Sequence, residues 1–145
     1  MSISQLNNTS DKLGTVFYAQ ITADQTGITT EVDVTGLTTA GTWTAVGGRR
    51  YRVTCQFETV QSVGGDAWVV EIKDAAGPTT LTRCTGSNGA SFSESKTVTY
   101  SNNASISGAK TWKITARRAV GSGTITFGAS ATYPAYLMIE DIGPL

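Results

Sequence analysis

Hydrophobic and polar residues alternate along most of this chain with a period of two. The alternation is clearest over residues 50–59, where Tyr51, Val53, Cys55 and Phe57 share one side. It returns in three more stretches, residues 67–73, 112–117 and 124–131. Successive side chains of a β-strand point to opposite faces, so each stretch predicts a strand with one buried face and one face in water.

Two further stretches are apolar on both sides for part of their length. They are residues 14–22 and residues 135–142. Continuous apolar runs are typical of strands that are buried on both faces, so we expect these two strands to be covered from both sides.

Turn-forming residues separate the predicted strands at intervals of about ten residues, the spacing that is typical of a β-sandwich. Asn88-Gly89 is the strongest hairpin sequence among them. We find no window with helical periodicity. The pattern predicts an all-β fold, a single jelly-roll-type β-sandwich of about eight or nine strands over residues 14–145. Residues 1–13 form a polar N-terminal arm ahead of it.

The composition limits the classes of function and partner that we expect. A chain of 145 residues is the size of one domain. Its 11 basic and 11 acidic side chains cancel, and nucleic acids and anionic membranes both select excess positive charge. We therefore expect no nucleic acid and no membrane as partner. The chain has no histidine, so the commonest general base and metal ligand are missing. This favours a protein that is not an enzyme and has no cofactor.

The acidic residues do not change this expectation. Glu140 and Asp141 are neighbours on a predicted strand and must point to opposite faces, so they cannot form a catalytic pair. Asp66, Glu71 and Asp74 lie close in sequence but lack the spacing of a calcium loop, so we expect no metal site.

Three further features are expected to serve the fold and not a binding site: the basic clusters, a glycine-rich loop and the two cysteines. We expect the arginines of residues 49–52 and Arg117-Arg118 to pair with acids on neighbouring strands or subunits. The loop at residues 121–124 resembles a phosphate loop but lacks its lysine and helix. The first ten residues have no apolar signal segment, so we expect Cys55 and Cys84 to remain thiols in a reducing cytoplasm.

Two features point to binding. Trp43 stands among polar neighbours and is the tryptophan we expect to be exposed, whereas Trp68 and Trp112 fall on the apolar side of their strands. Residues 133–145 are the most apolar stretch and run to the last residue, where chains are usually polar and frayed. We expect another copy of the chain to cover this stretch. The predicted subunit contacts are Tyr133, Tyr136, Leu137, Met138, Ile142 and Leu145.

Four passages carry a family resemblance: Thr29 to Leu37, Gly47 to Val53, Trp112 to Arg118 with Gly121 to Thr124, and Ile139 to Pro144. In this order they resemble small virion proteins of tailed bacteriophages, especially those that infect actinobacteria. Some of these are capsid decoration or head-fibre proteins, and others are distal domains of minor tail proteins. The family resembles trimeric jelly rolls of the tumour-necrosis-factor type. The resemblance implies a non-catalytic homotrimer on the virion exterior.

The resemblance alone leaves two locations open, the phage head and the tail. Tail proteins of this type carry a long N-terminal attachment region, so the short arm of residues 1–13 favours the head. We therefore predict a decoration protein, assembled in the host cytoplasm, that binds the major capsid protein on the outside of the phage head. The predicted capsid contacts are Ser4, Gln5, Leu6, Asn7 and Asn8. The alternative is a tail-fibre tip that binds a host surface glycan, with Trp43 as the possible glycan contact.

Overall fold

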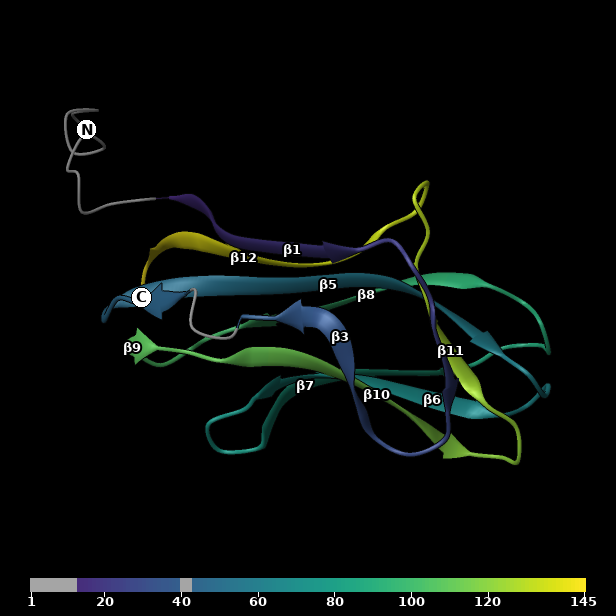
Figure 1. The fold of residues 1–145 in the computed structure, drawn as a ribbon. Coiled ribbons are helices and arrows are strands. Elements are labelled where there is room, and N and C mark those ends of the chain that lie inside the picture. The colour runs from purple at the N-terminus through teal and green to yellow at the C-terminus, as the bar shows by residue number, and fades with distance from the viewer. Residues whose placement is uncertain (1–12, 40–42) are drawn as a thin grey trace.

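The computed structural model describes residues 13–39 and 43–145, and within these ranges the chain forms strands and turns with no helix. Eight long strands build two four-stranded antiparallel layers (Figure 1). The first layer runs in the order β1 (Gly14–Ile21), β12 (Ala135–Pro144), β5 (Arg49–Gln61) and β8 (Glu94–Ser101). The second runs β3 (Val32–Thr38), β10 (Trp112–Val120), β6 (Ala67–Asp74) and β7 (Thr79–Ser87).

Four short strands complete the described part of the chain. They are β2 (Gln25–Ile28), β4 (Thr44–Ala45), β9 (Gly108–Ala109) and β11 (Ile125–Gly128). β11 pairs with the last residues of β5, beyond the end of β12, and carries β2 on its other side. The all-β jelly-roll sandwich is confirmed, with twelve strands in place of eight or nine, because β11 and β2 extend the first layer and β4 and β9 form a separate two-stranded sheet.

The core lies between the two layers and follows the predicted alternation. Phe57 of β5 packs edge-on against Trp68 of β6, with ring centroids 5.9 Å apart, and stacks on Phe127 at 5.2 Å. Trp68 and Trp112 are buried, as predicted. Inward side chains of both sheets therefore fill one continuous core.

The two strands predicted to be covered on both faces differ from that expectation. β1 is an edge strand that pairs only with β12 in its sheet, and its outward residues are exposed; Tyr18, for example, is 50% exposed. β12 lies between β1 and β5. Its inward residues are fully buried by the rest of the same chain, whereas Tyr136 and Met138 on its outer face are half-buried.

Asn88-Gly89 does not form the predicted hairpin. The strands on either side of it, β7 and β8, belong to different layers, so the turn crosses from one sheet to the other. The tight hairpin of the second layer lies instead between β6 and β7, at residues 75–78.

The two ends of the sandwich differ in what they carry. Leu13, where the described N-terminal residues begin, lies at the same end as the C-terminus and the β4–β5 connection (Figure 1). We call this the terminal end. The β5–β6, β7–β8 and β10–β11 connections lie at the other end, the distal end (Figure 1). No helix in the described residues is long and apolar enough to cross a membrane.

Candidate assembly surface

The outer face of the first layer is uncharged in its middle, between the Arg52–Glu140 ion pair toward the terminal end and Glu58 toward the distal end. Its strand register aligns outward side chains in rows that cross all four strands. One row contains Tyr18, Met138, Thr54 and Thr99, and the next contains Gln20, Tyr136, Gln56 and Thr97. We call these eight residues the uncharged face.

Two tyrosines give this face a fixed aromatic surface. The rings of Tyr18 and Tyr136 stack across β1 and β12 with centroids 5.7 Å apart and planes 26° apart. The Tyr18 hydroxyl donates a hydrogen bond of 3.0 Å to Oε1 of Gln20. Tyrosines combine a large apolar area with a polar tip and are enriched at interfaces, so this pair suits a contact with another molecule.

The outer face of the second layer is charged. Nζ of Lys73 lies 2.6 Å from Oε1 of Glu31 and 3.1 Å from Oε2 of Glu71, and Nζ of Lys113 lies 2.7 Å from Oδ1 of Asp33. Burial acts to lower the pKa of Lys73, but the hydrogen bonds to Glu31 and Glu71 outweigh it, and the pKa is raised. Glu31 and Asp33 are exposed, and covering their hydrated carboxylates costs more free energy than covering tyrosine, methionine and threonine. The uncharged face is therefore the better candidate for subunit contact.

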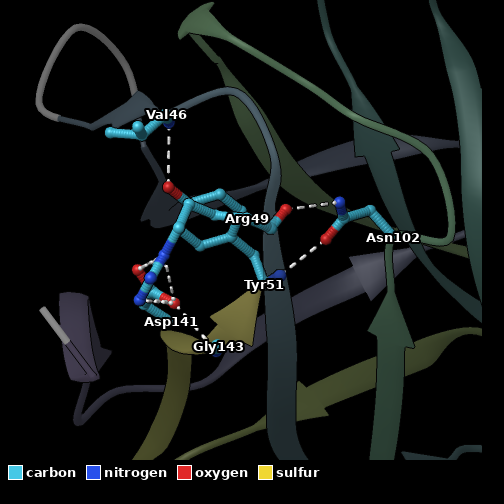
Figure 2. Close-up of polar contacts among 6 residues, drawn as sticks. All are labelled: Val46, Arg49, Tyr51, Asn102, Asp141 and Gly143. Atoms are coloured by element: carbon cyan, nitrogen blue, oxygen red, sulfur yellow. Dashed lines mark hydrogen bonds and ion pairs between the residues drawn. The ribbon is translucent and has the colours of Figure 1, made fainter. Parts of the chain in front are cut away.

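A buried ion pair orders the terminal end of the sandwich (Figure 2). The Arg49 guanidinium donates to the Asp141 carboxylate from Nη2 at 2.8 Å and from Nε at 2.9 Å, and both side chains are more than nine-tenths buried. Oδ1 of Asp141 also accepts from the Gly143 amide at 3.0 Å. The pair thus joins the start of β5 to the end of β12.

Further polar contacts extend this cluster to the neighbouring connections. Asn102 accepts from the Tyr51 amide at 2.6 Å and donates to the Arg49 carbonyl at 3.0 Å (Figure 2). The Tyr51 hydroxyl accepts from the Val46 amide at 2.8 Å (Figure 2). The cluster therefore holds the β4–β5 and β8–β9 connections against the C-terminal strand.

Exposed apolar side chains lie at this ordered end: Leu13, Val46, Ile142 and Leu145. The Leu145 amide donates to the Gly48 carbonyl at 2.9 Å, which fixes the last residue beside the β4–β5 connection. We call these four residues the terminal patch. An apolar patch on an ordered surface is typical of a contact site.

The predicted subunit contacts fall in four places. Tyr136 and Met138 lie on the uncharged face, and Ile142 and Leu145 lie in the terminal patch. Tyr133 is 67% exposed in the β11–β12 connection. Leu137 is fully buried, because alternation along β12 turns it into the core, so its side chain cannot contact another subunit. Tyr18 was missed, although it alternates with inward residues of its own strand.

The prediction that Trp43 is exposed is wrong. Trp43 is 4% exposed. Its ring packs against Trp112 with centroids 4.5 Å apart and edge-on against Tyr51 at 5.2 Å. A ring enclosed by two other aromatic rings cannot serve as an exposed platform for a glycan. The predicted capsid contacts in residues 4–8 lie outside the described residues.

The charged residues behave largely as predicted. Asp141 and Glu140 point to opposite faces, and each pairs with an arginine of β5: Asp141 with the buried Arg49 and Glu140 with the outward Arg52, at 2.9 Å. The predicted ion pairing is thus confirmed for Arg49 and Arg52. Arg118 instead donates to the Gly123 carbonyl.

The glycine-rich loop binds a carboxylate of its own chain. The amides of Ser122 and Gly123 donate to the buried Asp66 side chain at 3.1 and 2.8 Å. Within residues 13–39 and 43–145, no three His, Cys, Asp or Glu side chains gather as metal ligands. Cys55 and Cys84 are free thiols, and burial raises the pKa of both.

Comparisons with known proteins define the fold. No protein-family model matches the chain, and no curated protein matches it in sequence. Among solved structures, the Eiger TNF of S. frugiperda is similar with a TM-score of 0.50 and 13% identity, over 92% of this chain and 96% of that one. The chain thus shares a jelly-roll fold with that structure.

Two further structures are less similar. The infectious bursal disease virus VP2 subviral particle gives a TM-score of 0.47 at 10% identity, over 93% of this chain and 38% of that one. A carbohydrate-binding module of Cellvibrio mixtus lichenase 5A, in complex with cellotriose, gives 0.41 at 13% identity, over 87% and 97%.

Proposed function

We propose that this chain is a non-enzymatic structural protein of a bacteriophage virion, a homotrimeric decoration protein on the exterior of the capsid. The proposal combines the four sequence passages that resemble phage virion proteins with the jelly-roll fold that the chain shares with the Eiger TNF structure. The observation that carries it is the contrast between the eight-residue uncharged face, which lies beside the Arg52–Glu140 ion pair, and the outer face of the second layer, where the described residues form three ion pairs. One outer surface suits burial in an assembly, and the other suits water.

Self-association through the uncharged face has a direct test. Sedimentation at micromolar concentration is expected to give three times the chain mass of 15.2 kDa. Met138 sits inside one row of this face, so Met138→Lys places a charge in the contact and is expected to give single chains. Thr85→Lys adds the same charge on the outer face of the second layer and is the matched control. Wild-type protein of single-chain mass, or a Met138→Lys protein that still assembles, would refute the contact.

Capsid docking is assigned to the arm and the terminal patch. The arm precedes Leu13, which lies beside Gly143 at the terminal end, so the arm and the terminal patch would approach the major capsid protein together. A trimer at a local three-fold position would clamp neighbouring capsomers against internal DNA pressure. Deleting residues 2–13 is expected to leave a trimer that no longer binds capsids. Undiminished capsid binding by this trimer would contradict the role of the arm.

Imaging of intact virions separates the head from the tail. Protein found at the head supports decoration. Protein found at the fibre tip supports the alternative, a tail-fibre domain that binds a host glycan, for which buried Trp43 is no longer a contact.

A further inference from the structure

A pocket opens on the outer side of the first layer, toward the distal end. It encloses about 270 Å³ and is lined by Gln56, Glu58, Ser95, Tyr133 and Pro134, together with part of Phe57. Gln56 and Glu58 point outward from β5, and Ser95 lies opposite Glu58 on β8. In Figure 1 the β11–β12 connection, which carries Tyr133 and Pro134, rises above the β1–β12 layer.

The walls of this pocket are held in place. The Ser130 amide donates to the Tyr133 carbonyl at 2.9 Å, and the Tyr133 amide donates to Oγ of Ser130 at 3.0 Å. These bonds fix the turn that presents the Tyr133 ring. On the opposite side, Gly128 pairs with Glu58, and a Cβ at Gly128 would lie 3.0 Å from that of Glu58. The absence of a side chain there leaves Glu58 undisturbed.

Polar groups with free hydrogen-bonding capacity surround the exposed ring. Oε2 of Glu58 accepts from Oγ of Ser93 at 2.8 Å, which orients the carboxylate and leaves its other oxygen available. Within the described part of the chain, the Gln56 amide, the Ser95 hydroxyl and the Tyr133 hydroxyl have no hydrogen-bond partner. The pocket thus offers donors and acceptors beside an aromatic surface.

We propose that this pocket binds one ring of a neutral saccharide. A sugar ring has an apolar C–H face, which packs on an aromatic ring, and hydroxyl edges, which bond to carboxylate, amide and hydroxyl groups. The Glu58 carboxylate disfavours an anionic ligand, and the pocket has no basic residue in its lining. Its volume lies just below the roughly 300–1,000 Å³ of pockets for drug-sized ligands, so it suits a single ring.

The saccharide site adjoins the uncharged face toward the distal end and shares Gln56 with it, so its test has to be separated from that of the proposed assembly. Saturation-transfer difference NMR on the full-length protein, with the methyl glycosides of glucose, galactose, mannose and N-acetylglucosamine, detects weak binding at any protein size. At least one glycoside is expected to give a saturable signal, strongest on the C–H protons of one ring face. Tyr133→Ala and Glu58→Gln are each expected to reduce that signal at least five-fold.

Phe92→Ala is the matched control, because Phe92 is also an exposed aromatic residue, at 62%, but does not line the pocket. It is expected to leave the signal unchanged. No saturable signal with any of the four glycosides would overturn the proposal, as would a signal that survives Tyr133→Ala. Sedimentation of the same samples reports the oligomeric state, and the single chains expected for Met138→Lys leave the pocket uncovered by another subunit. Absence of sugar binding in both the wild-type and the Met138→Lys protein therefore refutes the site alone.

Discussion

Removing the Asp141 carboxylate is expected to cost far more stability than removing the carboxylate beside it. Asp141 is 6% exposed, and its oxygens accept from the Arg49 guanidinium and from the Gly143 amide. Asp141→Ala therefore leaves a buried guanidinium without this carboxylate, a change that costs about 3–5 kcal/mol. The free energy of unfolding of a native domain is about 5–15 kcal/mol in total, so the variant loses a large share of its stability.

Glu140 provides an internal control in the same strand. It pairs with Arg52 at 2.9 Å, but on the outer face, where Arg52 is 47% exposed. Exposed pairs contribute about 0–1 kcal/mol, so Glu140→Ala is expected to cost at most a third of the Asp141→Ala loss. Urea unfolding at one fixed protein concentration measures both, since any self-association makes stability depend on concentration.

The cause of the loss is tested with a second pair of variants. Arg49→Met/Asp141→Leu is expected to be more stable than Asp141→Leu alone, because it also removes the buried positive charge. Equal losses in Asp141→Ala and Glu140→Ala, or a double variant less stable than Asp141→Leu, would refute this account of the terminal end.

Two further predictions concern the core. A Cβ at Gly86 would lie 2.5 Å from the Trp68 ring, so Gly86→Ala is expected to lower the free energy of unfolding by about 1–3 kcal/mol in thermal unfolding. At Gly89 the nearest atom to an added Cβ is 3.9 Å away, so Gly89→Ala is the control and is expected to change this free energy little. Burial raises the pKa of the Cys55 thiol, so its contribution to stability is complete below the unfolded pKa of about 8.5 and is lost as pH rises toward the folded value. Urea midpoints between about pH 7 and pH 10 are therefore expected to fall above about pH 8.5, and to fall less steeply in Cys55→Ala.

The strand phases were predictable from sequence because alternation is a local property. Tyr51, Val53 and Cys55 turn inward as the pattern requires. The same rule places Trp43 and Ala45 on one side of the chain and Thr44 on the other, and both Trp43 and Ala45 are buried. The polar neighbours of Trp43 in the sequence were therefore a misleading sign of exposure. The rule also turns Leu137 inward, between Tyr136 and Met138.

Contacts between distant strands were not predictable in this way. Asn88-Gly89 has the composition of a hairpin turn, but local turn chemistry does not encode whether the flanking strands share a sheet. Arg49 and Asp141 are 92 positions apart, and their pairing depends on the register of β5 against β12. The pocket beside Tyr133 likewise joins residues of β5, β8 and the β11–β12 connection, which only the folded chain brings together.

The pairing of β1 with β12 has a kinetic consequence. The first and last strands of the described chain lie side by side, so their contact closes a loop of more than one hundred residues. Loop-closure entropy opposes such contacts until most of the chain is in place, and domains dominated by them fold in milliseconds to seconds. β12 is also flanked on both edges, so it cannot peel away without breaking its ladders to β1 and β5. Slow folding and slow unfolding are thus both expected from the position of β12 between β1 and β5.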